Sequence, residues 1–306
     1  MTATHQRIDA GPAGGFDLYT TDSGRTGPRV VVLGGVHGDE TEGALAAARL
    51  ASTDLVLRAG RLDVVPVCHE AAFAADSRTS PIDGGNLARV FPGDPEGTAT
   101  PRLAHHIYTE VLRGADFLVD LHTSGQHYDM PFLAGYGGAE PNTGSLPERA
   151  AIAFGADFVW RHPGRSEGRT LSVVEHGIYV ESPGGGPTDP SMVDRYFDGV
   201  LRVLAELEIL DGAPPRQPGE SVRVTGGGDL DRDMVSVGHD GVFLARVARG
   251  DRVEAGHLLG RVIDVAGETL EEHRAPATGH IMALKRRSPV RRGDLVVCLA
   301  EIDSVG

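Results

Sequence analysis

The chain has 306 residues, of which 24% are charged and 40% hydrophobic, and its formal net charge is −14 at pH 7. This length and composition fit a globular protein with one large domain or two, and the acidic balance argues against a nucleic acid or an anionic membrane as partner. No apolar run is long enough to span a bilayer, and residues 1–15 lack the apolar core of a signal peptide. The two cysteines, Cys68 and Cys298, lie far apart and predict no disulfide framework. We therefore expect a cytoplasmic protein.

The first informative stretch follows an apolar run. Val30 to Leu33 reads as a buried strand, and the Ala- and Leu-rich residues 42–51 read as a helix. Between them, Gly-Gly-Val-His-Gly-Asp-Glu places His37 and Glu40 on a loop at the carboxyl end of a central strand, where open α/β sheets bind ligands. An imidazole and a carboxylate at this spacing suit zinc, although an isolated His-x-x-Glu is usually an ordinary surface or capping pair.

A third zinc ligand is needed, because a catalytic zinc takes three protein ligands and an open position. The best candidate is His122, which ends the apolar run from Asp116 to Leu121. Asp120 lies two residues earlier, so both side chains leave the same face of the strand. Its carboxylate could accept a hydrogen bond from His122 or from His37. A purely structural buried aspartate is the competing interpretation.

The segment from residue 70 to residue 100 shows neither a helical nor a strand period and is rich in Gly, Pro, Asp and Arg. A loop of this length inside a compact domain is usually functional. It contains Arg78, Asn86 and Arg89. A guanidinium suits carboxylates and oxyanions, but a solvated loop with incidental arginines is the plainer interpretation of any one of them.

Further along the chain, a strand is expected to end in the carboxylate of Glu181, just before a glycine-rich turn. A carboxylate that faces a zinc pocket from a strand end is well placed to act as a general base. The pattern between residues 100 and 210 predicts a helix at 100–112, a Gly-rich loop at 124–144, a helix at 146–154, a helix from Arg169 to residue 175, a strand at 176–181 and an amphipathic helix at 192–210.

The Pro- and Gly-rich residues 211–219 are the clearest linker in the chain. They separate a predicted zinc-dependent catalytic domain, 1–212, from a β-rich domain, 220–306, built of short strands and turns. Segments of the second domain resemble the turns of lipoyl- or biotinyl-like β-domains, and a barrel is the alternative. Lys285 lacks the setting of a cofactor-carrying lysine, so we expect no attached group. We expect this domain to cap the active site or to mediate assembly, and we expect a homo-oligomer.

Four motifs in order resemble the succinylglutamate desuccinylase/aspartoacylase family of the zinc carboxypeptidase-like superfamily. They are Gly-Gly-x-His-Gly-Asp-Glu at 34–40, Asn-Leu-x-Arg-Val-Phe-Pro-Gly at 86–93, Asp-Leu-His at 120–122, and Glu181 before a glycine run. Residues 80–94 are closest to the branch that includes deacetylases of N-acetyl-2,4-diaminobutyrate from ectoine breakdown. The resemblance covers nearly the whole chain and implies an α/β catalytic domain, with a mixed sheet and helices on both faces, that binds one zinc ion and acts on a small-molecule substrate.

The resemblance also implies the role of each residue in a zinc-dependent amidohydrolase acting on an N-acyl amino acid. His37, Glu40 and His122 are expected to hold zinc, and Glu181 to deprotonate a zinc-activated water. Arg78 is expected to polarise the scissile carbonyl, and Arg89, with Arg169 as a second contact, to bind a substrate carboxylate. Apart from the resemblance, we expect Asn86 to help to hold the same carboxylate.

Two departures from the family pattern keep the substrate open. Ala88 stands where relatives usually carry an asparagine that helps to hold the substrate carboxylate, and Ser182-Pro183 interrupts the glycine run. A carboxypeptidase-like or amide-forming variant on the same scaffold therefore remains an alternative, as does a non-catalytic binding protein.

Overall fold

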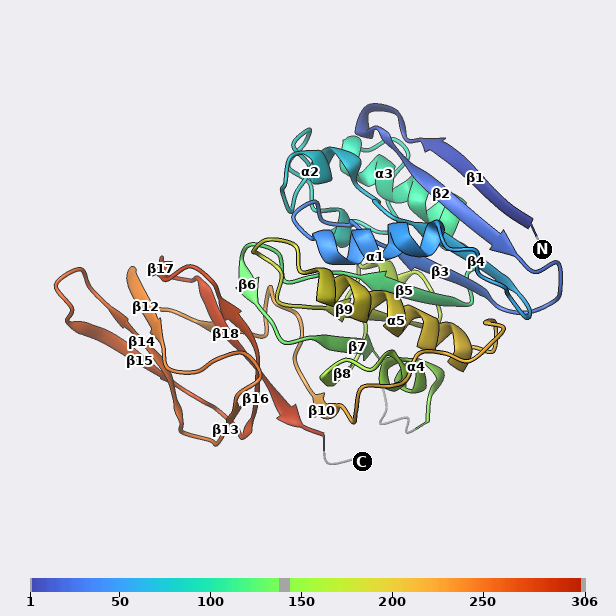
Figure 1. Cartoon of the computed structure of the whole chain (residues 1–306). Helices are drawn as coiled ribbons and strands as arrows, with labels where there is room; N and C mark the ends of the chain where they lie inside the picture. The colour runs from blue at the N-terminus through green and yellow to red at the C-terminus, as the bar shows by residue number, and fades with distance from the viewer. Residues whose placement is uncertain (1, 138–143, 304–306) are drawn as a thin grey trace.

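The structure, a computed structural model, describes residues 2–137 and 144–303. A mixed sheet of 14 strands runs through the molecule (Figure 1). Its first part has the order β1 (Thr2–Asp9), β2 (Gly15–Asp22), β4 (Arg61–Val65), β3 (Arg29–Leu33), β5 (Phe117–Leu121), β9 (Gly177–Glu181), β7 (Leu133–Gly137) and β8 (Phe158–His162). The sheet continues through β10 (Val222–Thr225), β18 (Leu295–Ile302), β16 (Gly279–Lys285) and β13 (Arg252–Val253), with β6 (Tyr128–Asp129) on β16 and β11 (Val235–Ser236) on β18.

The centre of the sheet is made of apolar segments that are buried on both faces. The apolar side chains of β3 and β5 are at most 1% exposed. β4, β3, β5 and β9 run parallel to one another, an arrangement that requires cover on both faces. The carboxyl ends of β3, β5 and β9 consequently meet at the same edge of the sheet.

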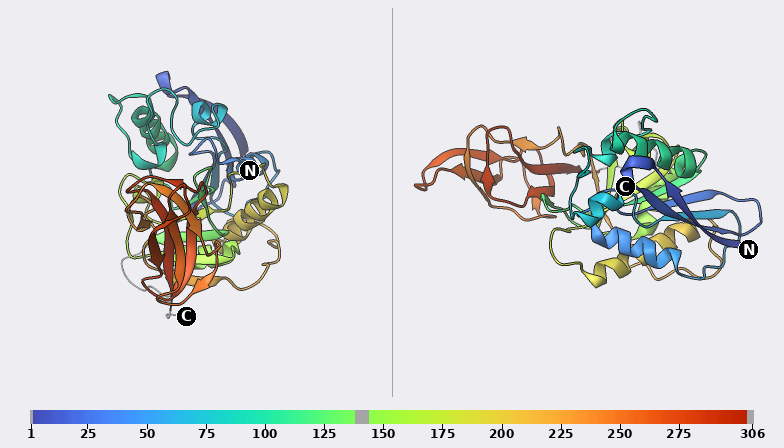
Figure 2. Two further views of the ribbon diagram at one scale, coloured as in Figure 1. Left: turned by 90° about the vertical axis from the view of Figure 1, so that its left-hand side faces the viewer. Right: turned by 90° about the horizontal axis from the view of Figure 1, so that it is seen from above.

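Helices provide that cover, with α1 and α5 on one face and α3 on the other (Figure 2, right). α1 (Thr41–Ala51), α4 (Leu146–Phe154) and α5 (Pro190–Glu206) share a core that contains Phe154 and Tyr196. α3 (Ala99–Ile107) encloses a second core with Phe16 and Leu103. The short helical segments are α2 (Glu70–Ala74), the 3₁₀ turns η1 (Gly11–Ala13), η2 (Leu87–Arg89) and η4 (Thr170–Ser172), and the π-turn η3 (Tyr108–Leu112).

We call residues 2–210 the body and the residues from β10 onward the C-terminal part. The regular elements of the C-terminal part are all strands, and most of this part protrudes from the body (Figure 1, left side). A second sheet in it has the order β15 (Thr269–Arg274), β14 (Leu258–Ile263), β12 (Gly241–Ala245) and β17 (Pro289–Val290). β10 pairs with β8 of the body and with β18, so the main sheet passes from one part into the other. Residues 211–219 form neither helix nor strand and are mostly exposed. A domain division at this segment stays a prediction.

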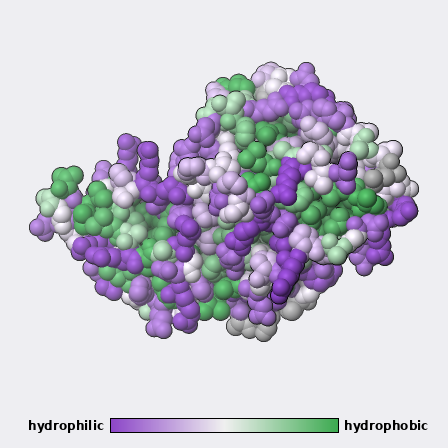
Figure 3. All heavy atoms as spheres, viewed as in Figure 1, coloured by the Kyte–Doolittle hydropathy of each residue, from purple (hydrophilic) through white to green (hydrophobic). Residues whose placement is uncertain are grey.

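Hydrophilic and hydrophobic residues are mixed on the face seen in Figure 3. Among the helices that the structure describes, none has the length and apolar character needed to cross a membrane.

The expected fold class, a mixed α/β sheet with helices on both faces, is confirmed. Two local expectations are wrong. The segment expected to be a Gly-rich loop contains β7, a strand inside the sheet, while its residues 138–143 lie outside the described part of the chain. The helix expected from Arg169 to residue 175 is only the short turn η4. α5 ends at Glu206, four residues earlier than expected.

Candidate active site

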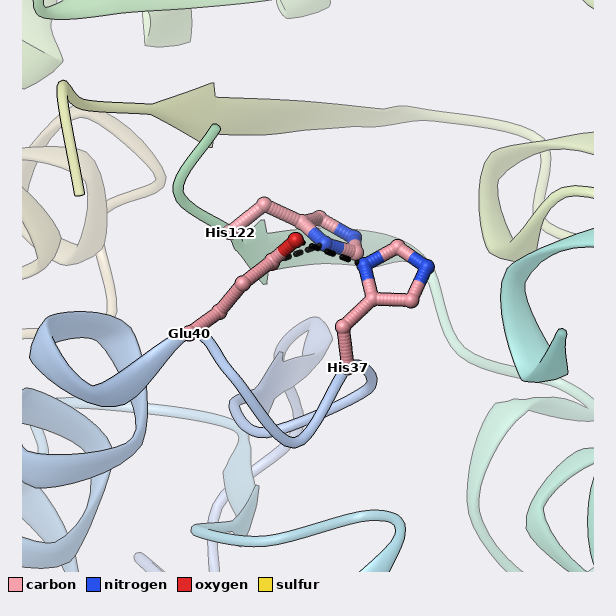
Figure 4. A group of neighbouring side chains, drawn as sticks. All are labelled: His37, Glu40 and His122. Carbon is pink, nitrogen blue, oxygen red and sulfur yellow. Dashed lines mark hydrogen bonds and ion pairs between the residues drawn. The ribbon is translucent and has the colours of Figure 1, made fainter. Parts of the chain in front are cut away.

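Three neighbouring parallel strands bring the chemically active side chains together. The loop after β3 carries His37 and Glu40, His122 follows β5 directly, and Glu181 is the last residue of β9. His37, Glu40 and His122 are only 2%, 1% and 7% exposed. One nitrogen or oxygen atom from each of these three residues lies within 4.8 Å of the others (Figure 4).

Glu40 lies between the two imidazoles. Its Oε1 atom is 2.8 Å from His37 Nδ1, and its Oε2 atom is 2.9 Å from His122 Nδ1. The backbone N–H of Thr123 also donates to Oε2, at 3.1 Å. Burial alone would raise the pKa of Glu40, but His37 and His122 outweigh it and hold this pKa well below its usual range. Glu40 is therefore an ionised carboxylate.

The outer nitrogen of each imidazole meets an oxygen acceptor. His37 Nε2 is 3.0 Å from the side-chain oxygen of Asn86, whose orientation is set because the same oxygen accepts the backbone N–H of Ala88. His122 Nε2 is 3.0 Å from Asp120 Oδ2. Acceptors at both Nε2 atoms hold protons there, so the Nδ1 atoms, which face Glu40, are the nitrogens that would coordinate a metal.

These residues fit zinc. Two imidazole nitrogens and one carboxylate form a donor set that catalytic zinc sites use, with room for a fourth ligand, and metal-binding histidines typically donate their outer N–H to an acceptor, as here. Burial, with Arg78 as a lesser cause, lowers the pKa of His37 to about 4, which keeps this ring neutral. Burial opposes a charge on His122 as well, but Asp120 and Glu40 outweigh it and raise its pKa well above the usual range.

A cavity of about 370 Å³ opens beside the three residues, and its lining includes Arg78 and Glu181. Arg78 Nη1 donates to Glu40 Oε1 at 2.9 Å and lies 3.2 Å from His37 Nδ1. The Oε2 atom of Glu181 is buried without a hydrogen-bond partner among the described residues. Burial and the charge of Glu40 raise the pKa of Glu181 well above its usual range.

The two arginines expected to hold a substrate carboxylate, Arg89 and Arg169, both line the cavity and converge on the backbone oxygen of Ala88. Each already contacts a carboxylate of the C-terminal part. Arg89 Nε donates to Asp231 at 2.8 Å, and Arg169 Nη2 donates to Asp229 at 3.0 Å. Both guanidiniums keep further N–H groups for a ligand, because each has five.

Asn86 is not among the residues that line the cavity, and its side-chain oxygen faces His37 instead. Its expected contact with substrate stays a prediction. Asp120 contacts the Nε2 atom of His122. His122 is one of the two histidines from which Asp120 was expected to accept a hydrogen bond. The hydroxyl of Thr170, which was not singled out from the sequence, donates to the same Asp120 oxygen.

Comparison with known proteins shows the family of the chain. The family model described as the succinylglutamate desuccinylase/aspartoacylase catalytic domain matches residues 26–207. The chain is 32% identical to the N-alpha-acetyl-L-2,4-diaminobutyric acid deacetylase of Halomonas elongata over 92% of this chain and 84% of that protein. The chain therefore belongs to the succinylglutamate desuccinylase/aspartoacylase family, as its motifs predicted.

Two solved structures of similar sequence share the fold of this chain. A product-bound structure of the ectoine utilization protein EutE (DoeB) from Ruegeria pomeroyi superposes with a TM-score of 0.83 at 31% identity, covering 98% of this chain and 95% of that one. A succinylglutamate desuccinylase from Silicibacter sp. TM1040 superposes with a TM-score of 0.84 at 29% identity and the same coverage.

Proposed function

We propose that this protein is a zinc-dependent hydrolase that removes the acyl group from an N-acylated amino acid. The observation that carries the proposal is the cluster of His37, Glu40 and His122 beside a cavity that Glu181 and Arg78 also line. The deacetylase name of the Halomonas relative supports an acetyl group, and its substrate supports an N-acetylated diamino acid as the first compound to test.

In the proposed mechanism, zinc would be held by His37, Glu40 and His122. When bound, it would polarise a carbonyl and lower the pKa of water to about 7. Glu181 takes the proton of the water that attacks the amide carbonyl and then delivers it to the leaving amine. Burial and the charge of Glu40 raise the pKa of Glu181, which makes its carboxylate a stronger base toward the attacking water.

The other residues would stabilise the oxyanion, orient the zinc ligands and hold the substrate. The guanidinium of Arg78 offers N–H donors to the oxyanion that forms on the carbonyl. Asp120 and Asn86 orient the two imidazoles through their Nε2 atoms. Asp231 and Asp229 leave some N–H groups of Arg89 and Arg169 unused. These N–H groups would hold the substrate carboxylate.

The proposal is tested with N-acetyl, N-succinyl and N-formyl amino acids as substrates, for the parent and for Glu181→Gln. We expect release of one acyl group by the parent and a loss of about 10²–10⁴-fold in turnover for the variant, with zinc content unchanged. Glu175→Gln is the matched control, because the Glu175 side chain is 86% exposed and lies outside the cavity lining. Near-normal turnover of Glu181→Gln would assign the base elsewhere, and no hydrolysis of any acyl amino acid by the parent would contradict the function.

A further inference from the structure

A hydrogen-bonded pair, Tyr179 and His162, lines the cavity beyond Glu181. Tyr179 precedes Glu181 by two residues on β9, so both side chains leave the same face of the strand. The Tyr179 hydroxyl is 2.7 Å from His162 Nε2, and His162 Nδ1 is 2.9 Å from the backbone oxygen of Gly227.

The direction of these hydrogen bonds follows from their partners. Burial lowers the pKa of His162 to about 4, so the ring is neutral near pH 7 and has one donor and one acceptor nitrogen. The Gly227 carbonyl can only accept, so Nδ1 carries the proton and Nε2 must accept from Tyr179. The phenolic oxygen thus commits its only proton to His162. What remains on that oxygen for the cavity is lone pairs, which can only accept a hydrogen bond.

Two glycines leave room for the rings of this pair. A Cβ atom on Gly135 of β7 would lie 2.1 Å from the Tyr179 ring, and one on Gly228 would lie 2.1 Å from the His162 ring. The two rings stack with centroids 5.6 Å apart at an interplanar angle of 22°. The pair is therefore held by packing as well as by hydrogen bonds.

One carboxylate near the pair is available to a cation. Asp233 lines the same cavity, and among the described residues it has no salt-bridge partner; its carboxylate accepts only the backbone N–H of Asp229. Three arginines of the cavity lining, Arg89, Arg169 and Arg232, are paired with Asp229 or Asp231, which partly balances their charge. Arg165, also in the lining, donates to the backbone oxygens of residues 174 and 175.

We propose that Tyr179, oriented by His162, is a specificity-determining residue that accepts a hydrogen bond from an ammonium group on the substrate side chain, with Asp233 as the counter-charge. The inference rests on the proposed deacylase function. Tyr179 and Glu181 are two positions apart on β9, which separates them by about 6.6 Å along the strand. The Tyr179 hydroxyl therefore lies away from the scissile amide beside Glu181 and meets a group further along the substrate.

The test uses two amines of nearly the same shape, 2,4-diaminobutyrate and norvaline, in which a methyl group replaces the side-chain ammonium. Their binding to the zinc-loaded protein is measured by calorimetry, which requires no turnover. We expect the parent to prefer diaminobutyrate and Tyr179→Phe to bind it about ten- to hundredfold more weakly, with norvaline binding unchanged, as for a lost hydrogen bond to a charged group. Tyr136→Phe is the control, because Tyr136 is buried but does not line the cavity.

A second variant, His162→Phe, leaves the tyrosine in place but frees its proton, and it should also reduce the preference for diaminobutyrate. No preference in the parent, or a preference that Tyr179→Phe retains, would overturn the inference. Turnover of the two N-acetyl derivatives is measured separately. Binding that follows the expected pattern without any turnover would support the inference and contradict the deacylase function.

Discussion

At the scale of single residues, the proposed zinc site depends on acceptors that surround the ligands. Asp120 receives the Nε2 proton of His122 and the hydroxyl proton of Thr170, both at its Oδ2 atom, which fixes the orientation of the carboxylate. Asn86 plays the corresponding part for His37 while its oxygen also caps η2 through the Ala88 N–H. These contacts fix which nitrogen of each ring faces the proposed metal position.

Asp120→Asn should therefore weaken zinc binding about 10–100-fold, because an amide is a poorer acceptor for the His122 proton and can present N–H instead. Zinc affinity is measured by titration against a competing chelator. Asp54→Asn, at an exposed position, is the control. Equal affinities in parent, Asp120→Asn and control would show that Asp120 does not support the ligand.

His162 predicts a pH effect on stability. Burial depresses its pKa from 6.5 to about 4, so below pH 6.5 the unfolded chain takes up a proton that the folded chain refuses. The free energy of unfolding should fall as the pH drops from about 6.5 to about 4, by on the order of 2 kcal/mol from this group. In denaturant titrations at pH 7 and pH 4.5, His162→Phe should lose less stability than the parent; an equal loss would contradict the assignment.

Part of the site could be predicted from local sequence. His37, Glu40 and His122 follow apolar runs at strand ends, and the two-residue period of a strand could also have pointed from Glu181 to Tyr179. The contact between Arg89 and Asp231 could not, because the two residues are 142 positions apart and Asp231 lies in no recognised motif.

At the scale of elements, strongly patterned segments were predictable and glycine-containing ones were not. The apolar runs gave β3 and β5, and α4 has the bounds that its sequence predicted. β7 was missed because glycine is depleted in strands and two of its five residues are glycine. Only the folded structure shows that Gly135 makes room for the Tyr179 ring.

The connection between α5 and β10 gives a prediction at this scale. Residues 211–219 lack regular structure and are mostly exposed, and Arg216 among them is exposed. Brief trypsin treatment of the native protein should cut first after Arg216, leaving an N-terminal fragment that contains His37, Glu40, His122 and Glu181. First cuts at other arginines, with this segment intact, would contradict the predicted linker.

At the scale of the whole molecule, the cavity is shared between the body and the C-terminal part. β3, β5 and β9 supply the proposed zinc ligands and base, while residues 227–233, just beyond β10, supply part of the opposite wall. The continuous sheet through β8, β10 and β18 fixes this wall relative to the metal position. Under the proposed function, this segment between β10 and β11 would take part in substrate selection.

The most direct test of the central claim is acetate release from N-acetyl-2,4-diaminobutyrate by one preparation, measured before metal removal, after exhaustive chelation and after addition of zinc in increasing ratio to the chain. The account predicts loss of turnover on chelation and full recovery near one zinc per chain, with no recovery in His122→Ala. Turnover that persists in the chelated protein, or recovery in His122→Ala equal to that of the parent, would contradict it.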